Sequence, residues 1–134
     1  MKVIIDTNII FSSLITSNSH RRKLLFSGEI KVYAPNYLIA EIFKHKERIR
    51  KASKLTNAEL SELLNKTMQH IHFVNEELIS TDNFFEAYHL CKGVDENDTA
   101  FVALYLELGG KLWTKDAELK TGLKKKGFDN FFEE

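Results

Sequence analysis

Apolar residues along the chain gather in short runs of strand character, and longer stretches with helical spacing separate these runs. Runs with the length and composition of strands cover residues 2–5, 30–33, 71–74 and 111–113. Strands that alternate with helices are typical of parallel β/α units, in which helices cover a central sheet. The pattern therefore predicts an α/β fold.

The helical stretches carry start and stop signals. They cover residues 9–26, 37–50, 56–70, 81–91, 99–108 and a last helix from 116 to about 124–127. Ala34-Pro35-Asn36 supplies a break before the second stretch, and Gly109-Gly110 ends the fifth. Residues 99–108 have almost no polar surface, so this helix is expected to be buried. Phe128 is a candidate for one more edge strand, which gives a sheet of four to five strands.

Length and composition indicate an ordinary globular protein. A chain of 134 residues can bury one substantial core, and this one shows no internal repeat and no Gly-, Ser- or Pro-rich linker. We therefore expect a single domain over residues 1–134. Hydrophobic residues make up 43% and charged residues 28% of the chain, values that fit a globular protein and not a disordered one.

Further sequence features bear on the cellular setting. Asp6 interrupts the apolar N-terminal run before an export signal could form, and no stretch is long enough to span a membrane. The single cysteine, Cys91, can form no internal disulfide and leaves no cysteine cluster for zinc. We expect a cytoplasmic protein. The 19 basic and 19 acidic residues cancel, so net charge does not indicate a nucleic-acid partner.

Four acidic residues stand where they could share one crevice. Asp6 and Asp116 follow the first and last predicted strands, at the carboxyl edge where open parallel sheets bind ligands. Asp98 begins the buried helix, and Glu41 lies within the apolar stretch 37–43, so both could point toward the same edge. The sequence therefore predicts that the four carboxylates converge.

Carboxylates gathered in this way repel one another and need a positive partner. Two like charges about 4 Å apart cost roughly 4 kcal/mol at an effective dielectric constant of about 20. Mg²⁺ and Mn²⁺ prefer carboxylate oxygen and water, and the sequence offers neither Cys/His spacing for zinc nor a glycine-rich phosphate loop. Such ions bind phosphate and activate water, which favours phosphodiester hydrolysis.

Each carboxylate also has an ordinary structural explanation. Asp6, Asp95 and Asp116 all stand where a helix N-cap is expected, and aspartate is favoured there. Glu41 could instead point outward beside a basic neighbour such as Lys44, as most helical acids do. The combination of acids at one edge, and no single member, carries the functional signal.

Four segments resemble the PIN-domain family in their residues, order and spacing. They are Val3-Ile4-Ile5-Asp6-Thr7-Asn8-Ile9-Ile10, Glu41, Asp98-Thr99-Ala100-Phe101-Val102-Ala103-Leu104 and Leu112-Trp113-Thr114-Lys115-Asp116. The resemblance covers nearly the whole chain. It implies a three-layer α/β/α fold with a central parallel sheet flanked by helices, an acidic pocket that binds Mg²⁺ or Mn²⁺, and single-stranded RNA as the substrate.

The resemblance also assigns roles to individual residues. The acids that match the family's catalytic positions, which also bind its metal, are Asp6, Glu41, Asp98 and Asp116. Asp95 resembles an additional metal-binding acid found in some members. Asn8 and Thr114 match polar positions that orient the carboxylates or the metal-bound water, and Thr7 joins this supporting set.

Many small PIN-domain proteins are VapC-like toxins of type II toxin–antitoxin systems, in which a partner antitoxin inhibits the nuclease. The resemblance therefore implies an endoribonuclease toxin with an antitoxin partner and a homodimeric assembly. Residues 98–114 resemble a subgroup whose partners are less uniform. Two alternatives stay open: an RNA-binding or regulatory PIN-like module without turnover, and an RNA-processing nuclease that is not a toxin. The sequence identifies neither the RNA, the metal, the antitoxin nor the dimer interface.

Basic residues gather at 21–23, 44–51 and 124–126, and each run has the ordinary interpretation of a solvated helix face. A nuclease must also attract phosphates that its own carboxylates repel. The candidates for that contact are Lys44, Lys46, Arg48 and Arg50. No catalytic role is expected for the histidines or for Cys91, because none has a partner at a suitable spacing.

Overall fold

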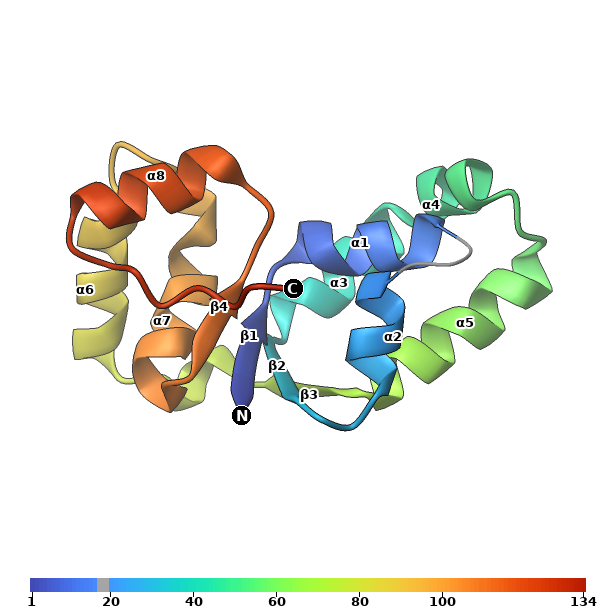
Figure 1. Ribbon diagram of the computed structural model, residues 1–134, viewed down its shortest axis with the longest axis horizontal. Coiled ribbons are helices and arrows are strands. Elements are labelled where there is room, and N and C mark those ends of the chain that lie inside the picture. Colours follow the sequence, from blue (N-terminus) through green and yellow to red (C-terminus); the bar gives the residue numbers. More distant parts are fainter. Residues whose placement is uncertain (17–19) are drawn as a thin grey trace.

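Residues 1–16 and 20–134 are described by the computed structural model, and they contain a four-stranded parallel sheet (Figure 1). Its strands are β1 (Lys2–Ile5), β2 (Lys31–Pro35), β3 (Ile71–Val74) and β4 (Lys111–Trp113). Their order is β3-β2-β1-β4, so β1 is central and pairs in parallel with β2 on one side and β4 on the other. The predicted α/β fold is confirmed.

Helices cover both faces of the sheet and complete a three-layer α/β/α arrangement (Figure 1). One side carries α1 (Thr7–Ile15), α2 (His20–Phe26), α3 (Tyr37–Lys44), α4 (Lys46–Ser53) and α5 (Asn57–Gln69). The other carries α6 (Thr81–Cys91), α7 (Thr99–Leu108) and α8 (Ala117–Lys125). Two 3₁₀ turns, η1 (Glu76–Leu78) and η2 (Glu96–Asp98), lie before α6 and α7. No helix in this described part of the chain has the length and apolar character needed to cross a membrane.

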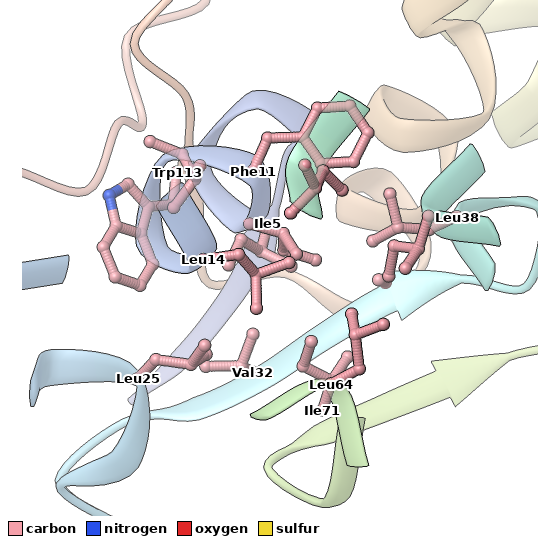
Figure 2. Close-up of a cluster of buried hydrophobic side chains, with 14 of the residues drawn as sticks. Ile5, Phe11, Leu14, Leu25, Val32, Leu38, Leu64, Ile71 and Trp113 are labelled. Atoms are coloured by element: carbon pink, nitrogen blue, oxygen red, sulfur yellow. The ribbon is translucent and has the colours of Figure 1, made fainter. Parts of the chain in front are cut away.

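The central strand is apolar on both faces because each face meets a layer of helices. Val3 and Ile5 belong to the core on the α1 side, together with Trp113 (Figure 2). Ile4 belongs to the second core, on the α7 side. Side chains alternate along a strand, so an unbroken Val-Ile-Ile run can be fully buried only between two helical layers. Burial of one such side chain contributes roughly 1.5–3 kcal/mol.

The turn from α7 into β4 depends on glycine. Gly110 has a φ of +87°, which L side chains rarely adopt. A Cβ atom at this position would also lie 2.3 Å from the carbonyl oxygen of Lys2. Glycine therefore lets β4 start directly beside β1.

Two predicted helices are interrupted. The stretch 9–26 ends its first helix at Ile15, because Thr16 has extended backbone angles (φ −94°, ψ 127°) and its N–H bonds to Ser12. Residues 17–19, which the same prediction included, lie outside the described residues. The stretch 37–50 is broken at His45 (φ −104°, ψ 12°), where α3 ends and α4 begins. Leu38, Ile42 and Ile49 keep the spacing of a continuous helix, so the pattern did not mark this break.

Two strand predictions are also corrected. β2 continues through Ala34 and Pro35, where a break was expected, because Pro35 pairs with Val74 of β3. Phe128 forms no edge strand. It packs against the rings of Tyr105 and Phe131, at 4.9 Å and 5.5 Å between centroids. A single parallel bridge between Leu112 and Phe131 takes the place of the fifth strand.

The strand order determines where a ligand site is expected. The chain moves outward from β1 through β2 to β3, and then returns to the opposite side of β1 with β4. In open α/β sheets the crevice for ligands lies at the carboxyl ends of the strands where this reversal occurs. Here that position is the joint end of β1 and β4.

Glu76 caps a helix to which it is not adjacent in sequence. Its carboxylate accepts hydrogen bonds from the backbone N–H groups of Asn36 and Tyr37, at 3.0 Å and 3.1 Å. The Tyr37 N–H is a free donor at the start of α3, which a helix must satisfy from outside itself, whereas the Asn36 N–H also donates to the carbonyl oxygen of Val74 at 3.0 Å. The contact fixes α3 against η1.

Loss of this cap is expected to lower the unfolding free energy. Glu76→Gln keeps the side-chain size but weakens two charge-assisted hydrogen bonds, at a cost of about 1 kcal/mol. Urea denaturation of this variant and of Glu77→Gln measures the effect. Glu77 is the exposed neighbour, and no side-chain hydrogen bond of its own is described. Equal destabilisation by the two substitutions would rule out the cap as the cause.

Candidate active site

Asp6 lies at the carboxyl end of β1 and is 7% exposed. Its carboxylate accepts a hydrogen bond from the backbone N–H of Asn8 at 3.4 Å, which caps α1. The other carboxylate oxygen accepts from the hydroxyl of Thr114 at 2.7 Å. The Asp6 N–H in turn donates to the carbonyl of Trp113 at 3.0 Å. Asp6 therefore joins the ends of β1 and β4.

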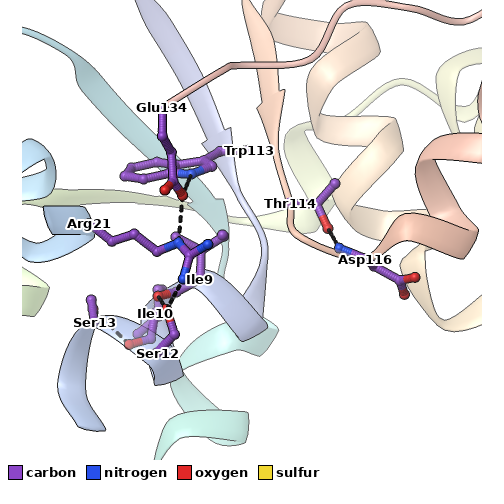
Figure 3. Close-up of polar contacts among 9 residues, drawn as sticks. All are labelled: Ile9, Ile10, Ser12, Ser13, Arg21, Trp113, Thr114, Asp116 and Glu134. Carbon is purple, nitrogen blue, oxygen red and sulfur yellow. Dashed lines mark hydrogen bonds and ion pairs between the residues drawn. The ribbon is translucent and has the colours of Figure 1, made fainter. Parts of the chain in front are cut away.

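Thr114 connects Asp6 to a second acidic residue. Its hydroxyl oxygen accepts from the backbone N–H of Asp116 at 3.1 Å (Figure 3). Asp116 caps α8 by accepting from the N–H groups of Glu118 and Leu119, at 3.0 Å and 3.1 Å. The capping role expected for Asp6 and Asp116 is therefore present, and it holds both carboxylates at the sheet edge.

Three carboxylates meet beside this edge. Asp95, Asp98 and Asp116 each present an oxygen, and these oxygens lie within 4.8 Å of one another. Asp95 also caps η2 by accepting from the N–H of Asn97 at 3.0 Å, so capping and clustering coexist in this residue. Among residues 1–16 and 20–134, no basic side chain forms an ion pair with any of the three.

The crowding of acids changes their protonation. Partial burial, with the nearby charges of Asp6, Asp95 and Asp116, raises the pKa of Asp98 to about 7. Burial also raises the pKa of Asp6, although hydrogen bonds from Thr114 and from the backbone of the following residues oppose the shift. Both carboxyl groups are therefore less acidic than usual, and a cation bound between them would restore the charged forms.

A cleft of about 610 Å³ opens beside the acids. The residues that line it are Asp6, Thr7, Asn8, Phe11, Tyr37, Glu41, Lys44, His45, Arg48, Asn97 and Asp98. Glu41 reaches it from α3, with a side chain 36% exposed that lies 3.5 Å from the Nε2 atom of His45. The structure thus brings Asp6, Glu41 and Asp98 to one cleft, and Asp95 and Asp116 adjoin it through Asp98.

The predicted supporting residues differ in how they contribute. Thr114 is buried and binds Asp6 through its side chain. Asn8 is exposed, and its described contact with Asp6 uses the backbone N–H. Thr7 lines the cleft together with Tyr37, and its side chain opposes part of the rise in the pKa of the Tyr37 hydroxyl group.

Tyr37 is a cleft residue that the sequence did not single out. Burial raises the pKa of its hydroxyl group, and the charges of Asp98, Asp6 and Glu41 add to the shift. Tyr37 therefore stays protonated and can donate a hydrogen bond beside the acids. Its position as the first residue of a predicted helix was the available signal, but an aromatic residue there resembles a core residue.

The four basic residues predicted to contact phosphate fall into two pairs. Lys44 and Arg48 line the cleft, and the guanidinium of Arg48 lies 6.0 Å from the ring centroid of Phe11. Lys46 and Arg50 do not line it. Arg50 binds Glu47 of its own helix, at 3.1 Å and 3.2 Å between Nε and the two carboxylate oxygens.

Comparisons with known proteins agree with this architecture. A family model described as the PIN domain matches residues 4–133. The chain is also similar to one in the crystal structure of VapBC2 from Rickettsia felis bound to a DNA fragment from their promoter. That match has a TM-score of 0.64 and 15% sequence identity, and it covers 100% of this chain and 98% of the other. At this identity the likeness shows the fold. No curated protein matches the sequence.

The raised pKa of Asp98 predicts how the stability of the metal-free protein depends on pH. The folded state keeps the proton up to about pH 7, whereas an unfolded aspartate releases it near about pH 3.9. This group therefore stabilises the fold fully below about pH 4, and the contribution is lost as pH rises through the folded pKa. Asp98→Asn should remove that loss and make the metal-free protein more stable than wild type above pH 7.

Urea denaturation at several pH values, in the presence of a chelator, measures this difference. Asp129→Asn is the matched control, because its carboxylate is 78% exposed and lies 3.8 Å from Lys124. An Asp98→Asn curve parallel to that of wild type would contradict the raised pKa.

Proposed function

This chain belongs to the PIN-domain family, and from this premise we propose that it is a metal-dependent endoribonuclease that hydrolyses phosphodiester bonds of single-stranded RNA. The observation that carries the proposal is the meeting of Asp6, Asp95, Asp98 and Asp116 at the joint end of β1 and β4. No cation of the described chain pairs with the last three. Such a group of oxygens fits a hard divalent ion, Mg²⁺ or Mn²⁺.

The metal ligands in this proposal are Asp6, Glu41, Asp95, Asp98 and Asp116, and Glu41 reaches the cleft from α3. A bound divalent ion supplies activation of water and stabilisation of charge on the leaving oxygen. The chain's own contribution is orientation. Thr114 and the backbone N–H of Asn8 donate to the two carboxylate oxygens of Asp6 and hold the group at the cleft, while the cap of α8 fixes Asp116.

The remaining cleft residues bind and position the substrate. Lys44 and Arg48 offset the negative potential of the acids and give phosphate groups a favourable contact. Tyr37, protonated at neutral pH, can donate a hydrogen bond to a phosphate oxygen without adding charge. The cleft is open and polar, which suits a flexible single strand.

The proposed biological role is that of a toxin in a type II toxin–antitoxin system of the cytoplasm. It is supported by the family and by the fold shared with a chain of a VapBC complex. An antitoxin partner and a homodimer belong to this proposal. The second candidate function is an RNA-binding module without turnover, since carboxylates and cations would line its cleft in the same way.

Cleavage of single-stranded RNA tests the nuclease. Purified protein should cut with Mg²⁺ or Mn²⁺ and stop when EDTA is added. Asp6→Asn and Asp98→Asn should each lower the rate roughly 100-fold or more, because each removes a carboxylate that would hold the divalent ion. Asp129→Asn, which changes an exposed aspartate far from the cleft in sequence and contacts, should cut as wild type does. RNA bound but left intact with every ion would favour the binding module.

The division among the basic residues predicts unequal effects on RNA binding. Lys44→Gln with Arg48→Gln should weaken binding and reduce the slope of log affinity against log salt by about 0.7 for each phosphate that is no longer neutralised. Lys46→Gln with Arg50→Gln makes the same change in net charge outside the cleft, and should have a smaller effect. Equal weakening by the two pairs would indicate general charge attraction and no binding of phosphate in the cleft.

A further inference from the structure

Three hollows run side by side along the carboxyl edge of the sheet. The acidic cleft shares Asn8, Phe11 and Arg48 with a second hollow of about 460 Å³. The second hollow shares Lys115 with a third of about 320 Å³. A strand that leaves the acidic cleft can therefore follow one continuous surface over Arg48 and Lys115.

The second hollow has the opposite charge from the cleft. Its charged lining residues are Arg48 and Lys115, and no acidic residue lines it. Lys115 stands between Thr114 and Asp116, directly beside the two segments that hold the acids. The carboxylates of the acidic cleft repel RNA phosphates, whereas the charged side chains of the second hollow, Arg48 and Lys115, attract them.

The third hollow already holds a carboxylate. Glu134 accepts hydrogen bonds on one oxygen, Oε1, from the Nε atom of Arg21 at 2.5 Å and from the indole N–H of Trp113 at 2.9 Å (Figure 3). Arg21 also donates to the hydroxyl of Ser12 at 3.1 Å, and Ser12 lines the second hollow. Arg21 thus stands where the second and third hollows meet.

We propose that the RNA strand continues from the acidic cleft over Arg48 and Lys115 to Arg21, and that the Glu134 carboxylate occupies the position of a phosphate there. A guanidinium and an indole N–H are donors that a phosphate oxygen accepts as well as a carboxylate does. This inference rests on the proposed RNA substrate. It adds the route that the RNA takes over the surface, and it identifies Glu134 as a group that competes with the RNA phosphate.

The ion pair between Arg21 and Glu134 is exposed enough for another anion to replace the Glu134 carboxylate. The side chains of Arg21 and Glu134 are 30% and 28% exposed, and ion pairs in contact with water are weak. The carboxylate belongs to residues 132–134, which form no strand or helix. An incoming phosphate therefore replaces Glu134 without any change in the sheet.

Binding of a labelled single-stranded RNA, followed by fluorescence anisotropy in EDTA, tests the path apart from cleavage. Lys115→Gln should weaken binding several-fold and lower the salt slope by about 0.7. Lys111→Gln is its matched control, because Lys111 is an exposed lysine at the opposite end of β4. Glu134→Gln should tighten binding about two- to fivefold, the range that an exposed ion pair spans.

Two comparisons distinguish competition between Glu134 and the RNA phosphate from a general effect of removing one negative charge. Glu133→Gln removes the same charge from the same hollow, but no hydrogen bond from Arg21 to Glu133 is described, so it should tighten binding less. Arg21→Gln should abolish the gain from Glu134→Gln in the double variant. Trp113, the single tryptophan, gives a second signal, since RNA should change its emission in wild type and less so in Glu134→Gln.

The possible results distinguish a failure of the proposed RNA path from a failure of the proposed nuclease activity. Cleavage by wild type together with unchanged affinity in Lys115→Gln and Glu134→Gln would overturn the path and leave the nuclease. Equal tightening by Glu133→Gln and Glu134→Gln, or a gain that survives in Arg21→Gln, would overturn the competition. RNA that binds with the expected pattern but is never cut would support the path and refute the nuclease.

Discussion

The parallel pairing of β1 with β4 is the constraint on which the site depends. It places residues that are 108 positions apart in hydrogen-bond contact, Asp6 with Thr114, and it creates the reversal in strand order where the crevice opens. Gly110 permits the pairing, because only glycine can approach the start of β1 so closely. The two apolar faces of β1 then secure the arrangement by packing against a helical layer on each side.

The acids gathered at this point oppose the stability of the fold. Partial burial and the repulsion from Asp6, Asp95 and Asp116 raise the pKa of Asp98 to about 7, so near neutral pH Asp98 is only partly ionised in the absence of a cation. Within residues 1–16 and 20–134, the donors that fix Asp6 and Asp116 are Thr114 and the first turns of α1 and α8, and no basic side chain forms an ion pair with them. The negative charge of these carboxylates is left without a basic partner in the described residues, and this is why we propose a divalent cation as their counter-charge.

Features that depend on local sequence could be predicted, and features that depend on distant partners could not. Asp6 and Asp116 were recognised because each follows an apolar strand, and strand ends meet at one edge. Asp95 was expected to be a cap, and the clustering of its carboxylate with Asp98 and Asp116 adds to that role. Glu76 gave no signal, since its partners lie about 40 residues away in α3. The break at His45 was hidden by apolar spacing that a continuous helix would also show.

The long separation in sequence between Asp6 and Thr114 also determines when the acidic group can form during folding. β4 is the last strand of the sheet, and the segment that carries Thr114 and Asp116 follows it. During synthesis, a chain that lacks this segment can form β1, β2 and β3, but it cannot form the hydrogen bond from Thr114 to Asp6 or complete the acidic group. Contacts between segments so far apart form late in folding because the loop between them must first be closed. The acidic group is therefore complete only after β4 and the segment that follows it have joined the sheet, so its assembly reports that the central strand has both of its neighbours.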